Sequence, residues 1–193
     1  IVALPGVAGA IVSVGVFVVC TAVGNTQNTP DRDQIDQDLW GVAPSISFGL
    51  DTDTRFTFSY FHLEQDNMPD YGLPWVPRTT NNTGLPSGAP DVSDSNWYGL
   101  RRRDFNETQT DIFTGTFEHD FQDNLKLTNI TRYGHNSTDL IATAPRFYTS
   151  SGSNKLPKGV DPTSVRRTDT KYRDEVDSIL SNQTDLRYDF ATG

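Results

Sequence analysis

The clearest pattern in the chain is an alternation of apolar with small or polar residues that begins at Val42 and continues to Leu50. A polar cluster at 51–54 follows, after which aromatic residues occupy alternate positions up to Tyr60. A period of two predicts β-strands with one apolar face, and the short polar connection predicts that the two strands form a β-hairpin. The alternating apolar residues are Val42, Pro44, Ile46, Phe48, Leu50, Phe56, Phe58 and Tyr60.

A second hairpin is predicted further along the chain, with strands at Glu107–Phe117 and Leu125–Tyr133 and a turn at Glu118–Asn124. Between the hairpins, residues 66–105 show no period and hold five of the eleven prolines, which predicts a long loop. Residues 135–175 are irregular again and rich in Ser, Thr, Gly and Pro, so they predict a second long loop. A last strand is predicted where Leu186, Tyr188 and Phe190 alternate with charged residues.

About five strands of near ten residues, connected alternately by short turns and long loops, predict part of an all-β, antiparallel transmembrane β-barrel. Only alternate residues of such strands need to be apolar, which fits a chain with 35% hydrophobic residues. The net charge of −9 argues against nucleic acid as a partner, because phosphate binding needs clustered Lys and Arg. The single cysteine, Cys20, permits no internal disulfide.

Residues 1–24 follow a different pattern, without a charged residue and long enough for a membrane-spanning helix by hydropathy alone. Pro5, four glycines and eight valines favour extended or irregular structure over that helix. We therefore divide the chain into an uncertain N-terminal stretch, 1–30, and a barrel portion, 31–193. We expect the chain to be an internal fragment of a longer protein.

Several short elements of the barrel portion resemble the TonB-dependent siderophore receptors, most of all those for catecholate siderophores. They occur in the order and spacing of that family, over residues 31–193, whereas residues 1–24 do not match it. The elements are residues 41–45, 69–72, 75–77, 98–100 and 117–121.

The resemblance implies an outer-membrane receptor of a Gram-negative bacterium that imports ferric siderophores. In that family a 22-stranded barrel surrounds a plug domain, and the TonB-ExbB-ExbD complex powers import through an N-terminal TonB box; plug and box do not occur in this chain. The loops at 66–105 and 135–175 would be extracellular, and the turns near 51–54 and 118–124 would be periplasmic. No cofactor is expected, because iron would travel as the ferric siderophore.

Ferric catecholates are anionic and aromatic, so a receptor would benefit from arginines for charge and from Tyr or Trp for stacking. Arg166 and Arg167 are weaker candidates from the second loop. The same aromatics could instead form an interfacial girdle, and the arginines could bind lipopolysaccharide phosphates or pair with Asp94 and Asp104. The ligand-binding candidates in the first loop are Tyr71, Trp75, Trp97, Tyr98, Arg101, Arg102 and Arg103.

No catalytic or metal-binding motif stands out. His62, His119 and His135 lack metal-ligand spacing, and His119–Asp120, in a predicted turn, has no nucleophile motif nearby. The acidic run at 31–38 lacks the glycine and the terminal glutamate of a calcium loop. We expect no enzyme activity and no metal site.

One alternative stays open at this point: a soluble or surface-anchored β-sandwich that binds a protein or a carbohydrate. Five Asn-Xaa-Ser/Thr triplets would suit it as glycan sites, although such triplets arise readily by chance in a polar chain. In a sandwich the apolar strand faces would be buried against a second sheet, whereas in a barrel they would form one exposed outer band.

Overall fold

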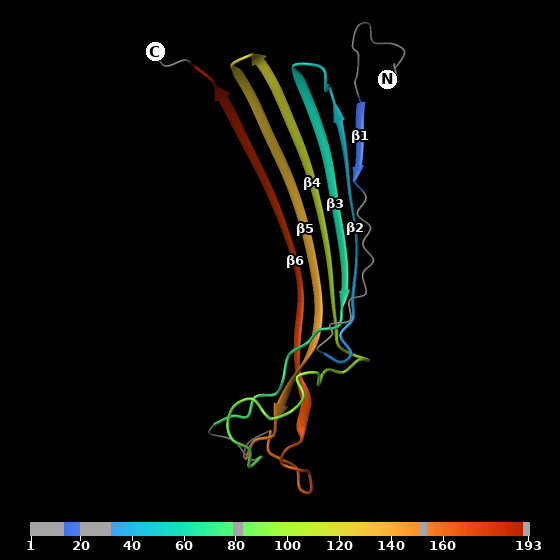
Figure 1. Cartoon of the computed structure of the whole chain (residues 1–193), viewed down its shortest axis with the longest axis vertical. Helices are drawn as coiled ribbons and strands as arrows, with labels where there is room; N and C mark the ends of the chain where they lie inside the picture. Colours follow the sequence, from blue (N-terminus) through green and yellow to red (C-terminus); the bar gives the residue numbers. More distant parts are fainter. Residues whose placement is uncertain (1–13, 20–31, 79–82, 151–153, 191–193) are drawn as a thin grey trace.

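The computed structural model describes residues 14–19, 32–78, 83–150 and 154–190. These residues form one six-stranded antiparallel sheet in which each strand pairs with the next along the chain (Figure 1). The sheet is open, and β1 and β6 are its two edges. The strands are β1 (Val14–Val19), β2 (Gln37–Phe48), β3 (Thr54–Asn67), β4 (Phe105–Gln122), β5 (Leu125–Phe147) and β6 (Val165–Tyr188).

The connections are short at one end of the sheet and long at the other, as Figure 1 shows. The turn at 49–53 connects β2 to β3, and the turn at 123–124 connects β4 to β5. At the opposite end of the sheet, residues 68–104 connect β3 to β4 and residues 148–164 connect β5 to β6. Gly49 has φ 73°, and a Cβ there would lie 2.1 Å from the carbonyl oxygen of Thr54, so the first turn requires glycine. The first hairpin and the first long loop therefore match their predicted places within a few residues.

The second half of the chain differs from its prediction, because the strands there are much longer than expected. Residues 135–147 and 165–175, predicted as loop, belong to β5 and β6, and the true second loop is 148–164. The turn predicted at 118–124 is shorter than expected, since β4 continues to Gln122 and only 123–124 form the turn. Residues 135–139 and 166–171 are polar on both faces, and residues 140–147 are mostly apolar on both faces, so the period of two disappears while the backbone ladder continues.

The N-terminal stretch contributes one strand, because Val14–Val19 is β1 and pairs with the end of β2. The sheet therefore has six strands, one more than predicted. The remaining residues of the 1–24 stretch lie outside the described part of the chain. Within that described part, no helix is long and apolar enough to cross a membrane.

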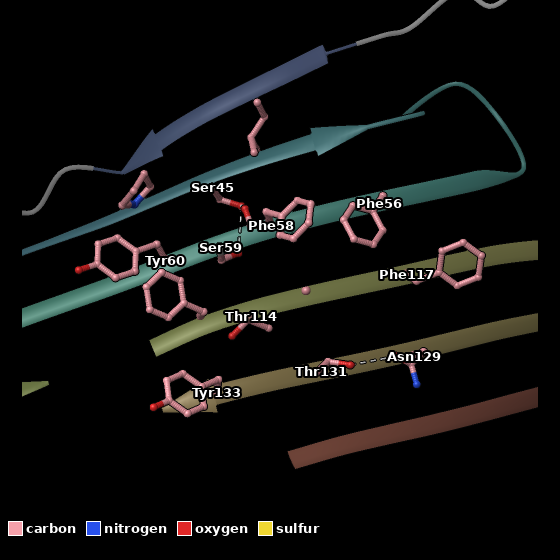
Figure 2. A pocket seen from close by; sticks show the side chains of 14 residues that line it. Ser45, Phe56, Phe58, Ser59, Tyr60, Thr114, Phe117, Asn129, Thr131 and Tyr133 are labelled. Carbon is pink, nitrogen blue, oxygen red and sulfur yellow. Dashed lines mark hydrogen bonds between the residues drawn. The ribbon is translucent and has the colours of Figure 1, made fainter. Parts of the chain in front are cut away.

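The cross-strand register places the aromatic residues of β2, β3 and β4 on one face, with the exception of Phe61. Phe48 pairs with Phe56, which pairs with Phe117, while Ile46 and Phe58 occupy the next row beside Gly115. Because Gly115 has no side chain, the surrounding rings border a shallow apolar depression, seen in Figure 2. The opposite face is mostly polar, with hydroxyl pairs such as Ser45–Ser59, 3.1 Å apart, although it also carries Phe61, Ile112 and Ile130.

Two sets of polar residues change the character of this apolar face. On β5 and β6 a polar quartet, Asn129, Thr131, Asn182 and Thr184, continues the rows of Phe117 and Gly115. The two asparagine amides bond each other reciprocally at 3.1 Å, and each also donates to a threonine hydroxyl at 2.7 Å. Toward the long loops the face is crossed by a row of five carboxylates, and a further row of Phe105, Ile141 and Tyr172 lies beyond it. The five carboxylates are Asp38, Asp66, Glu107, Asp139 and Asp174.

Neither face of the sheet is covered by a second sheet in the described part of the chain. Phe58 keeps 50% of its surface exposed and Phe113 keeps 52%, as expected for an outer band rather than a sandwich interior. The sandwich alternative is therefore wrong for the described residues. Their buried apolar residues cluster instead near the long-loop end of the sheet: Ile35, Val76, Ala142, Ala144 and Phe147.

Candidate functional site

The loop at 68–104 packs against the ends of β5 and β6, beneath the sheet in the view of Figure 1. Four consecutive residues of β5, 142–145, are buried, and successive strand residues point to opposite faces, so both faces of β5 are covered there. Arg167 of β6 donates to the carbonyl oxygen of Gly99 at 3.2 Å. Loop 68–104 is thereby attached to β5 and β6 as well as to β3 and β4, the strands that it connects.

Two of the aromatic candidates are presented to solvent. Tyr71 is 49% exposed and Trp75 is 64% exposed. Contacts of Asp70 stabilise the backbone beside Tyr71. The Asp70 carboxylate accepts from the N–H of Gly72 at 2.9 Å and pairs with Arg32 at 2.9 Å. Val76, directly after Trp75, is fully buried and exchanges two backbone hydrogen bonds with Gly88. A buried residue next to an exposed indole fixes the direction in which the ring points.

The other two aromatic candidates, Trp97 and Tyr98, are half-buried. The indole N–H of Trp97 donates to the carbonyl oxygen of Pro69 at 3.1 Å, which ties the two halves of the loop together. A Cβ at Gly99 would lie 2.1 Å from the Trp97 ring, so this contact requires glycine.

The three consecutive arginines have three different environments. Arg101 bonds Gln34 and lies 3.5 Å from Asp36, both just before β2. Arg102 is exposed and forms no hydrogen bond or ion pair with another described residue. Arg103 donates to Asp104 at 3.1 Å and to the hydroxyl of Thr143 at 2.6 Å. Of the three arginines, only Arg102 therefore has a guanidinium without a partner among the described residues.

Asp104, which the sequence suggested only as an arginine partner, is the most buried carboxylate of this region. Its side chain is 1% exposed. Its Oδ2 accepts the backbone N–H of Leu100 at 2.9 Å and that of Thr143 at 3.0 Å, and its Oδ1 accepts from Arg103. In the sequence, the only signal for this buried position of Asp104 was that it directly precedes β4, which begins at Phe105.

Arg166 and Arg167 lie in β6 and not in the second loop, so their predicted placement is wrong. The sheet register shifts between Ala144 and Arg146, opposite these two arginines, where Pro145 has no N–H to give the ladder.

Loop 148–164 contains a tight turn in which the hydroxyl and the N–H of Thr163 both donate to Asp161. These bonds hold the pKa of the Asp161 carboxyl below its usual value.

The three histidines lie in separate strands. His62 contacts Asp111 at 2.8 Å, and His135 contacts Ser178 at 3.0 Å. His119 lies in β4 rather than in a turn and contacts the hydroxyl of Thr54 at 2.8 Å. Within the described part of the chain, no three His, Cys, Asp or Glu side chains converge on a metal-sized site.

Comparison with proteins of known sequence gives close and consistent relatives. No protein-family model matches the chain. The probable TonB-dependent receptor BfrD of Bordetella pertussis is 34% identical over 89% of this chain and 22% of its own length. The catecholate siderophore receptor Fiu of Escherichia coli K12 is 32% identical over 89% of this chain and 23% of its own length. The chain thus spans less than a quarter of the length of these two relatives.

Solved structures agree with the sequence comparison. The closed form of the ferric-catecholate import receptor Fiu of E. coli K12 superposes with a TM-score of 0.68 at 28% identity, over 94% of this chain and 27% of that one. The siderophore receptor PiuA of Acinetobacter baumannii gives a TM-score of 0.65 at 30% identity, over 84% and 22%. In sequence and in strand arrangement, the chain is homologous to a segment of the β-barrel of TonB-dependent siderophore receptors.

Proposed function

We propose that the protein to which this chain belongs imports ferric siderophores of the catecholate class across the outer membrane. The single observation that carries the proposal is the exposed set Tyr71, Trp75 and Arg102 at the long-loop end of a sheet homologous to ferric-catecholate receptors. An unpaired guanidinium offers charge to an anionic catecholate complex, and exposed rings offer stacking surfaces.

The difference between the apolar and the polar face of the sheet supports the proposal that the sheet is part of the wall of a membrane barrel. The apolar face would contact lipid and the polar face would line the lumen. The row of five carboxylates would lie above the lipid, on the extracellular side with loops 68–104 and 148–164, and the turns at 49–53 and 123–124 would face the periplasm. The open edges at β1 and β6 would pair with further strands of the same barrel, because unpaired backbone is costly in lipid.

In this proposal binding and release are the only steps that the barrel performs. Iron is the cargo, carried inside its siderophore, and no resident cofactor is needed. Energy would come from the TonB-ExbB-ExbD complex acting on parts of the protein outside this chain.

The test is growth under iron starvation of a receptor-deleted bacterium that carries the full-length gene. Ferric catecholates, ferric hydroxamates and haem are supplied in turn as the only iron source. We expect rescue by a ferric catecholate alone. Rescue by none of the three, with the receptor present in the outer membrane, would reject iron import.

The role of the exposed arginine is tested with Arg102→Ala. We expect about a tenfold rise in the ferric catecholate concentration that half-saturates uptake, because a hydrogen-bonded charge pair with the ligand is lost. The matched control is Arg187→Ala, near the short turns at the opposite end, where the side chain is 76% exposed. Equal effects of the two substitutions would show that Arg102 does not contact the ligand.

A further inference from the structure

We propose that Asp104 is the positioning residue of this site: its buried carboxylate fixes where loop 68–104 presents its arginine and aromatic side chains. The inference rests on the proposed function for its ligand, and it adds a residue that contacts no ligand itself. It follows from the geometry around the point where the loop becomes β4.

The first step is the turn that Asp104 closes. The N–H groups of Arg103 and Asp104 both donate to the carbonyl oxygen of Leu100 at 2.8 Å. In the opposite direction, the Asp104 carboxylate accepts the N–H of Leu100 at 2.9 Å. The segment 100–104 is thus closed by hydrogen bonds in both directions, and it holds Arg101 and Arg102 on its exposed side.

The second step is the attachment of this turn to the sheet. β4 begins at Phe105, which pairs with Ile141, while β5 continues to Phe147. Beyond Ile141, β5 has no β4 residue beside it, and Asp104 Oδ2 accepts the N–H of Thr143 instead, at 3.0 Å. One carboxylate oxygen therefore serves both a loop N–H and a strand N–H, so the loop cannot move without breaking a buried bond.

The third step is charge. A carboxylate that is 1% exposed needs a compensating cation, and Arg103 supplies it at 3.1 Å. Arg103 is therefore used inside the loop, where it also donates to the hydroxyl of Thr143. This internal pair explains why the three consecutive arginines divide into one structural residue and two that face outward.

The functional consequence is preorganisation. A loop that is already ordered does not spend ligand-binding energy on ordering itself. Replacing Asp104 with asparagine keeps its size but removes its charge and one of its two acceptor oxygens. Either Arg103 or both backbone N–H groups then lose their acceptor. The loop should then detach from β5 while the strand ladder of the barrel persists.

The experiment uses the full-length receptor in outer-membrane vesicles and compares Asp104→Asn with Asp94→Asn, an exposed aspartate of the same loop. The first measurement is the rate of trypsin cleavage at Arg101 and Arg102. The second is uptake in cells of the ferric complex of 2,3-dihydroxybenzoate over a range of concentrations. Barrel folding is followed by the shift in gel mobility on heating.

For Asp104→Asn we expect cleavage about tenfold faster and a half-saturating concentration about tenfold higher, with the maximal uptake rate within about twofold. Asp94→Asn should change none of these. Cleavage and uptake equal to those of the control would overturn the proposal, and so would loss of the folded barrel. If the native receptor takes up no ferric catecholate, the proposed function fails, while the cleavage comparison still decides the role of Asp104.

Discussion

The strand wall and the long-loop end of this chain are stabilised in different ways. In the wall, from β2 to β6, backbone ladders run along whole strands and large side chains such as Phe58 stay half exposed. At the loop end, few backbone ladders exist, and single residues such as Val76 and Asp104 are almost fully buried. The wall depends on a repeated pattern, whereas the loop depends on a few individual contacts.

The difference teaches where each region tolerates change. A wall residue has many equivalent neighbours, so its face matters more than its identity. A loop residue such as Asp104 bonds specific partners up to 39 positions away, so its identity matters more than its polarity. Substitutions that change the polarity of a wall position, or the identity of a loop residue, should therefore affect the stability of the two regions differently.

The largest effect is expected from a charge on the apolar face of the wall. Phe58→Arg should destabilise the folded barrel by about 2–4 kcal/mol, the cost of arginine at the middle of a membrane strand. Thr116→Arg, on the opposite face of β4, should cost less than about 1 kcal/mol. Urea unfolding of the receptor in lipid vesicles measures both. Equal costs would mean that the two faces of the sheet do not differ in environment.

A smaller effect is expected from the buried side chain of the loop. Val76→Ala removes two methyl groups at a site with 0% exposure, at a cost of about 2 kcal/mol in local stability. Hydrogen exchange should quicken in loop 68–104 and stay unchanged in β3 and β4. Val92→Ala, at a 37% exposed position of the same loop, should change exchange little. Faster exchange throughout the strands would show that wall and loop unfold together.

The smallest net effect is expected from the polar quartet within the wall. Asn129→Leu alone should cost about 1 kcal/mol, because it leaves the amide of Asn182 without its reciprocal partner. Replacing both asparagines with leucine should restore stability to within about 0.5 kcal/mol of the native receptor, since no amide is then left unpaired. Additive losses in the same urea experiment would show that the two amides act independently.

The same division decides how much could be predicted from sequence. Alternation between Val42 and Tyr60 located the first hairpin, and the absence of any period located the loop after Asn67. Alternation could not reveal β1 in a uniformly apolar stretch, nor the parts of β5 and β6 near the long loops, where apolar and polar residues do not alternate. In those parts only the pairing with neighbouring strands identifies the structure.

In the candidate site, residue types could be predicted but their roles could not. Charge and aromatic content pointed to the loop that contains Trp75 and Arg102, whose ligand roles stay predictions. Nothing in three consecutive arginines indicates that Arg103 is held internally while Arg102 is exposed. That distinction depends on Thr143, which the chain brings to the loop only after a complete hairpin.

The reciprocal amide pair of Asn129 and Asn182 has a consequence for how β5 and β6 find each other during assembly. Sliding one strand by a single residue moves every side chain to the wrong face and is strongly penalised. Sliding it by two residues restores every face, so alternation alone does not oppose that error. The amide pair does oppose it, because a two-residue slide moves both asparagines away from the threonines directly opposite them, whose hydroxyls they bond. The polar quartet within the apolar face thus favours the native register of β5 and β6.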